Sequence, residues 1–472
     1  MREPPTSSSS ESSELPDLIV AGRIRRADGT WGRGEIWARG GRICAVHDEP
    51  PTGPSSVTAK RIDVGDDFVL PGAVDAHVHS LSHHGEGVAA STRAAAAGGV
   101  TSIVEMPFDF SGPINNRERL LRKQDVVHDE AMIDVALLGT LAPQGGWREA
   151  ETLAEHGVVG FKVSLFLTDP DRFPRISDFE MLDVMSAVYD VGGTLCTHAE
   201  NNEIVQGLLG VERATRPTEA QAHSRSRPPV SETLGVLTAL EIAADRGTAL
   251  HVCHLSLPRS IDLVSWYQEQ GVDVTLETCP HYLVFTQDDL DQQHGYLKIN
   301  PPLRTRVDQA GMWERLEAGD VSVISSDHAP WPVEFKSHEH ILDNHSGVPG
   351  VETLVAVTLG RALARDPQLS TFSNVVDALT ITPARRFGID ARKGSLEVGK
   401  DADIMVFSPN ADAEARIDAS AMHSNAGWSP YDGMVPGGVV SMTISRGMLV
   451  WSLENRLIGS AGRGEMLTKV GS

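Results

Sequence analysis

One stretch decides the fold: Leu70-Pro71-Gly72-Ala73-Val74-Asp75-Ala76-His77-Val78-His79. Its short apolar run is typical of a buried β-strand, and the run ends in two histidines. Side chains alternate along a strand, so His77 and His79, two residues apart, point to the same side. A His-x-His pair is common by chance in a chain with 18 histidines. The interpretation therefore depends on whether other strands end in residues of similar chemistry.

Seven further segments have the same apolar character, and helical patterns fill the gaps between them. The expected strands are Ala73–His79, Val100–Met106, Ile133–Thr140, Val158–Val163, Thr194–His198, Ala249–His254, Val272–Glu277 and Val321–Asp327. The expected helices include Gly87–Gly98, Asp178–Val191, Ser231–Arg246 and Arg259–Gln270. Eight apolar strands that alternate with helices predict a (β/α)8 TIM barrel, a fold of the α/β class. A doubly wound open sheet would alternate in the same way, but no G-x-G-x-x-G follows the first strand, which makes it the weaker alternative.

The two ends of the chain have a different texture. Short strand-like pieces separated by turn residues occupy residues 15–69 and return in 390–455, for example at Asp403–Phe407 and Val439–Ile444. This pattern predicts one small β-sandwich domain formed from both chain ends, and two separate β units are the alternative. We assign residues 70–389 to the barrel, 1–14 to a disordered Ser- and Pro-rich tail and 456–472 to a C-terminal tail.

Composition excludes several classes of protein. The 472 residues include 64 acidic and 41 basic side chains, giving a formal net charge of −23. This balance argues against a nucleic-acid or anionic-membrane partner, which requires clustered Lys and Arg. The four cysteines, Cys44, Cys196, Cys253 and Cys279, are too few and too scattered for a disulfide scaffold. Because no segment resembles an export signal or a membrane span, we expect a cytoplasmic protein.

Unusual side chains end four of the other predicted strands. Lys162 ends the fourth, His198 the fifth, His254 the sixth and Asp327 the eighth. Each alone has a structural explanation, such as a histidine bonded to a carbonyl or an aspartate that caps a helix. Together with the His-x-His pair, however, they would all lie on one rim of the barrel. Imidazole and carboxylate ligands predict a metal centre, with zinc favoured over manganese or iron.

The order of motifs resembles the amidohydrolase superfamily, in its cyclic-amidase branch of hydantoinases, dihydropyrimidinases, allantoinases and dihydroorotases. The resemblance extends from about Asp17 to Val450. Its motifs are residues 70–79, Gly98–Thr101, Gly160–Lys162, Thr197–Glu200, Glu277–Leu283, Asn300–Arg304, Ser326–Pro330 and Lys393–Asp403. The resemblance implies hydrolysis of a C–N bond in a cyclic amide or ureide. It also implies a homo-oligomer, a dimer or a tetramer.

The resemblance also implies roles for individual residues. His77, His79 and Asp327 would bind one divalent cation, and His198 and His254 a second. Lys162, whose ammonium cannot bind metal, would be carboxylated and bridge the two ions. Asp327 would also serve as general acid and base. The implied substrate contacts are Asn300, His328, Gly347 and Gly350, and we add Asp109, which could accept a hydrogen bond from a ureide N–H.

At several positions this sequence differs from the motifs of the branch, and these differences indicate which substrate the resemblance favours. Leu81 and Phe108 stand where dihydroorotases carry the arginine and asparagine that hold a carboxylate, which counts against that activity. Leu167 replaces the tyrosine of hydantoinases, and Met106-Pro107-Phe108-Asp109 is similar to the allantoinase motif. We therefore favour an allantoinase-like or hydantoinase-like hydrolase. The alternatives are a dihydroorotase-like enzyme, a mononuclear deaminase, for which Lys162 is unneeded, and a non-catalytic scaffold. His83 and His84 could reach a substrate, but a solvated loop is the better interpretation.

Overall fold

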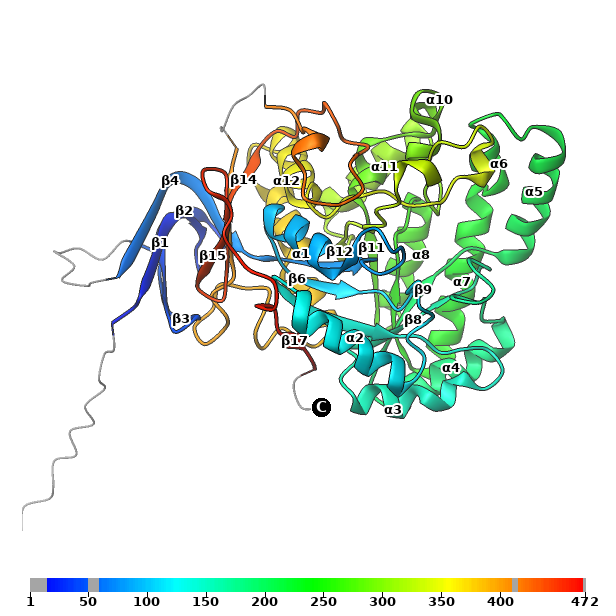
Figure 1. The fold of residues 1–472 in the computed structure, drawn as a ribbon, viewed down its shortest axis with the longest axis horizontal. Coiled ribbons are helices and arrows are strands. Elements are labelled where there is room, and N and C mark those ends of the chain that lie inside the picture. The colour runs from blue at the N-terminus through cyan, green and yellow to red at the C-terminus, as the bar shows by residue number, and fades with distance from the viewer. Residues whose placement is uncertain (1–14, 50–58, 410–414, 470–472) are drawn as a thin grey trace, which may run out of the picture.

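A computed structural model describes residues 15–49, 59–409 and 415–469. Eight parallel strands follow one another around a barrel in the order of the sequence (Figure 1). They are β5 (Ala73–Val78), β6 (Val100–Glu105), β7 (Asp134–Gly139), β8 (Gly160–Ser164), β9 (Thr194–His198), β10 (Ala249–Val252), β11 (Val274–Thr278) and β12 (Val323–Ile324). A parallel bridge between Val78 and His328 links the last strand region back to the first. The predicted (β/α)8 barrel is confirmed, and the open-sheet alternative is wrong.

Two of the strands end at least two residues earlier than the sequence predicts. The sixth stops two residues before His254, and the eighth stops three residues before Asp327. Both residues have positive φ angles, 39° for His254 and 45° for Asp327, which a β-strand cannot contain. Polar contacts replace the ladder beyond β12, where the Ser326 amide donates to Oδ1 of Asp75 at 3.0 Å. The predicted site residues therefore lie just past the strand ends, on the rim itself.

Helices surround the barrel, and the four that we predicted are present within one or two residues of the expected bounds. The longer helices are α1 (Gly87–Ala97), α2 (Arg117–Glu130), α4 (Asp178–Asp190), α5 (Asn202–Thr215), α7 (Pro229–Arg246), α8 (Pro258–Glu269), α11 (Arg306–Ala318), α12 (Leu354–Arg365) and α13 (Ser370–Leu379). Shorter ones are α3 (Ala150–Glu155), α6 (Ala222–Ser226), α9 (Pro280–Val284), α10 (Leu290–Gln293) and α14 (Ile381–Arg386). Local signals set their starts: Ser177 and Glu180 form a capping box before α4, and proline opens α7 and α8.

Both chain ends build one eight-stranded sheet beside the barrel, where the blue strands β1 to β4 lie next to the red β14 and β15 (Figure 1). Its strands are β1 (Leu18–Arg25), β2 (Trp31–Arg39), β3 (Arg42–His47), β4 (Lys60–Pro71), β13 (Ile404–Ser408), β14 (Val439–Ser445), β15 (Met448–Ser452) and β16 (Arg456–Leu457). The two halves join where β13 pairs antiparallel with β4, Ile404 opposite Pro71. The single β domain is thus confirmed over two separate units, and hydrogen bonds connect all eight strands in one path.

Residues 456–472, which we expected to form a tail, contain structured elements in their described part. Besides β16, the strand β17 (Met466–Leu467) pairs in parallel with β7 of the barrel, Met466 opposite Val135. The Leu467 side chain is buried against the barrel core. Apolar burial and the β17 ladder hold this segment on the barrel, so the expectation of a tail is corrected here.

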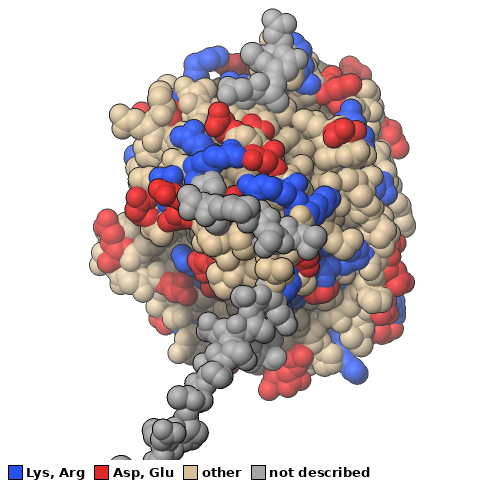
Figure 2. All heavy atoms as spheres, turned by 90° about the vertical axis from the view of Figure 1, so that its left-hand side faces the viewer, with Lys and Arg blue, Asp and Glu red and all other residues tan. Residues whose placement is uncertain are grey.

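The surface on the β-domain side carries basic and acidic side chains side by side (Figure 2). Among the strands of this domain, Arg33 pairs with Asp63 at 2.5 Å, and Arg25 of β1 pairs with Asp377 at 2.8 Å. Because opposite charges alternate, the positive electrostatic potential that would attract a polyanion is weaker here than over a cluster of cations. Within the described part of the chain, no helix has the length and apolar character needed to cross a bilayer.

Candidate metal centre

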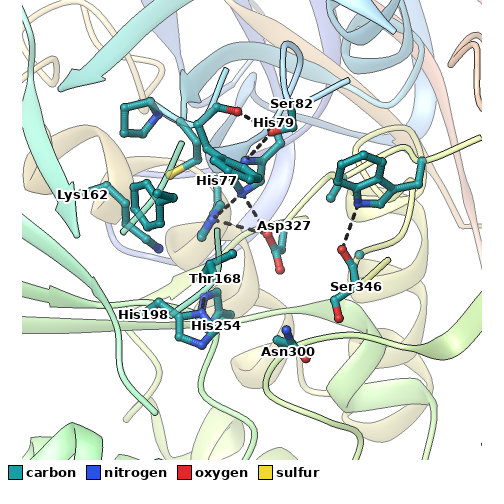
Figure 3. A pocket seen from close by; sticks show the side chains of 17 residues that line it. His77, His79, Ser82, Lys162, Thr168, His198, His254, Asn300, Asp327 and Ser346 are labelled. Atoms are coloured by element: carbon teal, nitrogen blue, oxygen red, sulfur yellow. Dashed lines mark hydrogen bonds and ion pairs between the residues drawn. The ribbon is translucent and has the colours of Figure 1, made fainter. Parts of the chain in front are cut away.

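Three predicted ligands meet at the mouth of the barrel. His77 lies on β5, His79 directly after it, and Asp327 beyond β12. Figure 3 shows the three side chains turned toward one another, with His198 and His254 close together below them. Nε2 of His77 lies 3.2 Å from Nε2 of His79 and 3.3 Å from Oδ1 of Asp327. Their donor atoms all lie within 4.8 Å of one another, so one cation could contact all three.

Hydrogen bonds on the far side of each ring define which nitrogen is free. Nδ1 of His77 donates to Oε1 of Glu277 at 2.5 Å, because a carboxylate only accepts. The Ser82 hydroxyl donates to the Phe108 carbonyl at 2.9 Å and therefore accepts from Nδ1 of His79 at 3.1 Å. Both Nε2 atoms then carry lone pairs that face each other. Two lone pairs at that separation repel, and a cation between them would remove the conflict.

His198 and His254 form a second donor group. Nδ1 of His198 lies 3.1 Å from Nε2 of His254. The opposite nitrogen of His198, Nε2, contacts Oε2 of Glu200 at 2.7 Å, which leaves Nδ1 as the lone-pair atom. Glu200 is itself held by the buried guanidinium of Arg227. The ring of His198 is therefore oriented by an acidic partner in the same way as that of His77.

Lys162 is the least satisfied side chain of this site. Its residue is only 4% exposed, and its Nζ atom has no hydrogen-bond partner among the described residues. An unpartnered buried amine is costly, so its position requires a further explanation. Lys162 projects from β8 into the same cavity as the histidines (Figure 3). The four imidazoles and one carboxylate beside this lysine fit a site for divalent cations.

Burial adjusts the charge states of these groups. It lowers the pKa of His77 to about 4, with the Lys162 charge acting in the same direction. Burial also lowers the pKa values of His79, His198 and His254, so the rings are neutral near pH 7 and can donate their lone pairs. Burial raises the pKa of Asp327 well above its usual range, with the charges of Glu277 and Asp75 acting in the same direction. In the absence of a cation, this carboxyl group therefore holds a proton more readily than an exposed aspartate.

The positive φ angles of His254 and Asp327 are informative in themselves. Neither residue is glycine, and such a conformation costs of order 1–3 kcal/mol per residue. Strain of this kind persists where the surrounding contacts over-determine it, and it clusters at functional sites. In this protein the strained backbone directs the side chains of His254 and Asp327 into the barrel mouth.

The donors line a cavity of about 110 Å³. Its other walls are Ser82, Met106, Pro107, Phe108, Thr168, Phe173, Asn300, Ala329, Trp331, Ser346 and Gly347. Asn300 and Gly347, both predicted substrate contacts, are therefore among the residues that line the cavity. Oδ1 of Asn300 is buried without a hydrogen-bond partner among the described residues.

Three predicted substrate contacts lie outside this cavity. Asp109 accepts from Nζ of buried Lys123 at 2.6 Å, and that ion pair engages its carboxylate away from the cavity. His328 accepts from the amide of Gly350 at 3.1 Å through Nδ1, so both residues are engaged with each other. In this structure Asp109 belongs to a buried ion pair, and His328 and Gly350 hold the loop that carries Gly347.

His83 and His84, which the sequence left as a solvated loop, have defined contacts in the structure. His83 packs between Trp331 and Phe335, and the His84 ring lies 3.7 Å from that of Phe110, so both sit in aromatic contacts outside the cavity. Sequence reasoning missed Glu277, Ser82, Trp331 and Ser346. Glu277 alone offered a signal in the sequence, because it is an acidic residue inside an apolar strand. In the structure it contacts two histidines, His77 and His251.

Comparisons with known proteins identify the family of this chain. The model of the amidohydrolase family matches residues 68–450. An allantoinase from Rubrobacter xylanophilus is 35% identical over 95% of this chain and 97% of its own length. An allantoinase from Deinococcus radiodurans is 33% identical over 96% of this chain and 98% of its own length. The solved L-hydantoinase (dihydropyrimidinase) from Arthrobacter aurescens superimposes with a TM-score of 0.90 at 31% identity, covering 96% of this chain and all of that chain. The chain therefore belongs to the amidohydrolase family.

Proposed function

We propose that this protein is a metal-dependent hydrolase that opens the ring of a cyclic ureide, of the allantoin or hydantoin type. The observation that carries the proposal is the convergence of four histidines, Lys162 and Asp327 in one cavity at the carboxyl ends of the barrel strands. The similarity to allantoinases and to an L-hydantoinase over nearly the whole chain supports the same reaction class.

Two divalent cations fit the donor set, and zinc suits its imidazole and carboxylate ligands best. His77, His79 and Asp327 would hold one ion, and His198 and His254 the other. Carboxylation of Lys162 by carbon dioxide would replace an unpartnered ammonium with an anionic head able to bind both ions. When bound, such cations lower the pKa of water toward about 7 and polarise a carbonyl group.

The protein's own groups then handle the proton and the ring. Asp327 takes the proton of the attacking water on its carboxylate and delivers it to the departing ring nitrogen, which leaves poorly unless protonated. Asn300 and Gly347 contact the ring from the cavity wall, and Phe108 covers it with an apolar face. The product is a ring-opened carboxylic acid.

Dihydroorotate is the less suitable ring. Phe108, which lines the cavity, offers an apolar ring where a carboxylate would need a donor. Leu81, the other departure from the dihydroorotase motif, packs against the apolar core. These two positions favour a ring without a carboxylate at this point of the cavity.

A substrate panel tests the proposal. Protein loaded with zinc is mixed with allantoin, hydantoin, 5-substituted hydantoins, dihydrouracil and dihydroorotate, and the carboxylic acid product is measured alongside the metal content. We expect about two zinc ions per chain and opening of allantoin or a hydantoin, both abolished in His254→Ala and retained in the exposed control His128→Ala. Protein that holds two ions and opens none of these rings would overturn the proposal, and protein without metal would point to a scaffold.

We further propose that the enzyme acts in the cytoplasm as a homo-oligomer. All four cysteines are free, and three of them are buried, as expected for a reducing compartment. The dimer or tetramer follows from the family resemblance. Light scattering coupled to size-exclusion chromatography measures the number of subunits.

A further inference from the structure

Lys336 is a buried lysine that lies behind the side of the metal-centre cavity formed by Ser346 and Gly347, which we call the loop wall. Its residue is 1% exposed. Its Nζ atom donates to the carbonyls of Lys298 at 3.0 Å, His345 at 2.8 Å and Gly347 at 2.7 Å. Gly347 lines the cavity, whereas Lys336 does not. The hydrogen bond to Gly347 therefore joins an amine outside the cavity to the backbone of its wall.

Three consecutive carbonyls along the loop wall accept hydrogen bonds from side chains. Those of His345 and Gly347 accept from Lys336. The carbonyl of Ser346, between them, accepts from Nε1 of Trp331 at 2.9 Å. Trp331 also lines the cavity. The position of this backbone therefore depends on two side-chain donors, and Lys336 supplies two of the three hydrogen bonds.

The partners of Lys336 indicate its charge. Among the described residues they are carbonyls only, with no carboxylate. An ammonium group has three N–H donors, whereas a neutral amine has two and would leave one of the three carbonyls without this donor. The ring centroid of Trp428 lies 5.7 Å from Nζ, within the range of a cation–π contact. Burial, together with the charge of Lys298, lowers the pKa of Lys336 well below its usual range, and the three carbonyls oppose that effect.

A second buried lysine, Lys298, binds the chain just before the loop wall. It donates to the carbonyls of Leu342 and Asn344. Two carbonyls match the two N–H groups of a neutral amine, whereas Lys336 has three acceptors. Of these two neighbouring lysines, Lys336 is therefore the one whose hydrogen bonds require the ammonium form.

We propose that Lys336 is a positioning residue for ring opening: its ammonium group takes the place of a bound cation and holds the carbonyls of His345 and Gly347, so that the loop wall keeps the shape that receives the ring. The inference rests on the proposed function, in which Gly347 contacts the substrate. None of the carbonyls that Lys336 binds belongs to a proposed metal ligand. Loss of the ammonium group should therefore weaken substrate binding and leave the zinc content unchanged.

Lys336→Ala with chemical rescue tests the inference, because n-propylammonium replaces the missing atoms from Cγ to Nζ. We expect the variant to raise KM about 10- to 100-fold for the ring that the wild type opens best, with kcat changed less than about threefold and about two zinc ions per chain. Added n-propylammonium should restore part of the loss. Propan-1-ol, which has the same size but no charge and a single donor, should not. The exposed control Lys60→Ala should behave as the wild type.

Hydrogen exchange gives a readout that does not depend on activity. In zinc-loaded Lys336→Ala, the backbone amides of residues 341–350 should exchange faster than in the wild type, as measured by mass spectrometry, and n-propylammonium should slow them again. If the wild type opens no ring, the proposed function fails, and the exchange rates still decide whether Lys336 holds the loop wall. The two proposals therefore fail separately.

A KM within about twofold of the wild-type value in Lys336→Ala would overturn the inference, and so would unchanged exchange in residues 341–350. Equal effects of n-propylammonium and propan-1-ol would also overturn it, because the N–H donors would then not be what holds the wall. Loss of zinc together with kcat would show general destabilisation instead of positioning. If Lys336→Ala does not fold, Lys336→Met, which keeps the stem but has no N–H donor, decides the point by the same measurements of KM, kcat, zinc content and exchange.

Discussion

Nδ1 of His77 lies 2.5 Å from Oε1 of Glu277, although 200 residues separate them in sequence. The other carboxylate oxygen of Glu277 accepts from Nε2 of His251 at 3.2 Å, and Oε1 also accepts from the His254 amide at 3.1 Å. One buried carboxylate thus fixes the tautomer of one proposed ligand and the backbone of another. Burial opposes the ionised form of Glu277, but His77 and His251 outweigh it and hold its pKa well below the usual range.

The first prediction concerns this carboxylate. Glu277→Gln replaces a carboxylate, which only accepts, with an amide that can also donate to Nδ1 of His77. His77 can then carry its proton on Nε2, where it blocks metal binding. We expect zinc affinity to fall about 10- to 100-fold, as is usual when a carboxylate partner of a metal-bound histidine is lost. Competition with a fluorescent chelator measures the affinity. The exposed control Glu314→Gln should bind zinc as the wild type does, and unchanged affinity in Glu277→Gln would remove Glu277 from the site.

Asp327→Asn tests the proton transfer. The amide cannot accept the proton of the attacking water, so we expect kcat to fall about 10²- to 10⁴-fold. Because Asp327 is also a proposed ligand, the metal content must be measured on the same sample, and the rate is compared at equal zinc loading. The exposed Asp245→Asn serves as control. A variant with two zinc ions and nearly full kcat would show that another group moves the proton.

Lys162→Arg tests the proposed modification. An arginine keeps the positive charge but does not form the carboxylated amine, and its larger head would crowd a cavity of about 110 Å³. We expect the zinc content to fall from about two ions per chain to one or none, with activity lost in parallel. Elemental analysis gives the content, and mass spectrometry under native conditions gives the mass of one carbon dioxide in the wild type. Full occupancy in the variant would contradict a bridging role, and Lys60→Arg, at an exposed position, is the control.

The sequence was sufficient to predict the barrel, its rim and the positions of all six proposed ligands. The reason is that strand ends follow from local apolar patterns, and parallel strands bring their carboxyl ends to one face. It did not show the contacts that Asp109, His328 and Gly350 make, because their partners come from other parts of the chain. Lys123 lies on a helix, and the loop at 347–350 returns from beyond β12, so neither contact leaves a local signature.

The last prediction concerns pH and Lys298, a buried lysine that donates to the carbonyls of Leu342 and Asn344. Burial is the main cause that lowers its pKa to about 7, and the nearby charges of Arg227 and Arg213 add to the effect, while Asp343 opposes it. In the unfolded chain a lysine titrates near 10.4. Between these values the unfolded chain binds a proton that the folded protein does not, so the free energy of unfolding rises with pH. Below pH 7 both states are protonated, and this dependence disappears.

Lys298→Met lacks the titrating group and isolates the effect. We expect the stability of the wild type relative to this variant to increase by about 2 kcal/mol between pH 7 and pH 9, measured by urea unfolding of zinc-loaded protein at both values. The variant is less stable overall, because the carbonyls of Leu342 and Asn344 lose their donor, but that loss is the same at both pH values. The exposed control Lys60→Met should show no such change. A pH-independent difference for Lys298→Met would mean that Lys298 remains charged in the folded protein and that the carbonyls around it outweigh its burial.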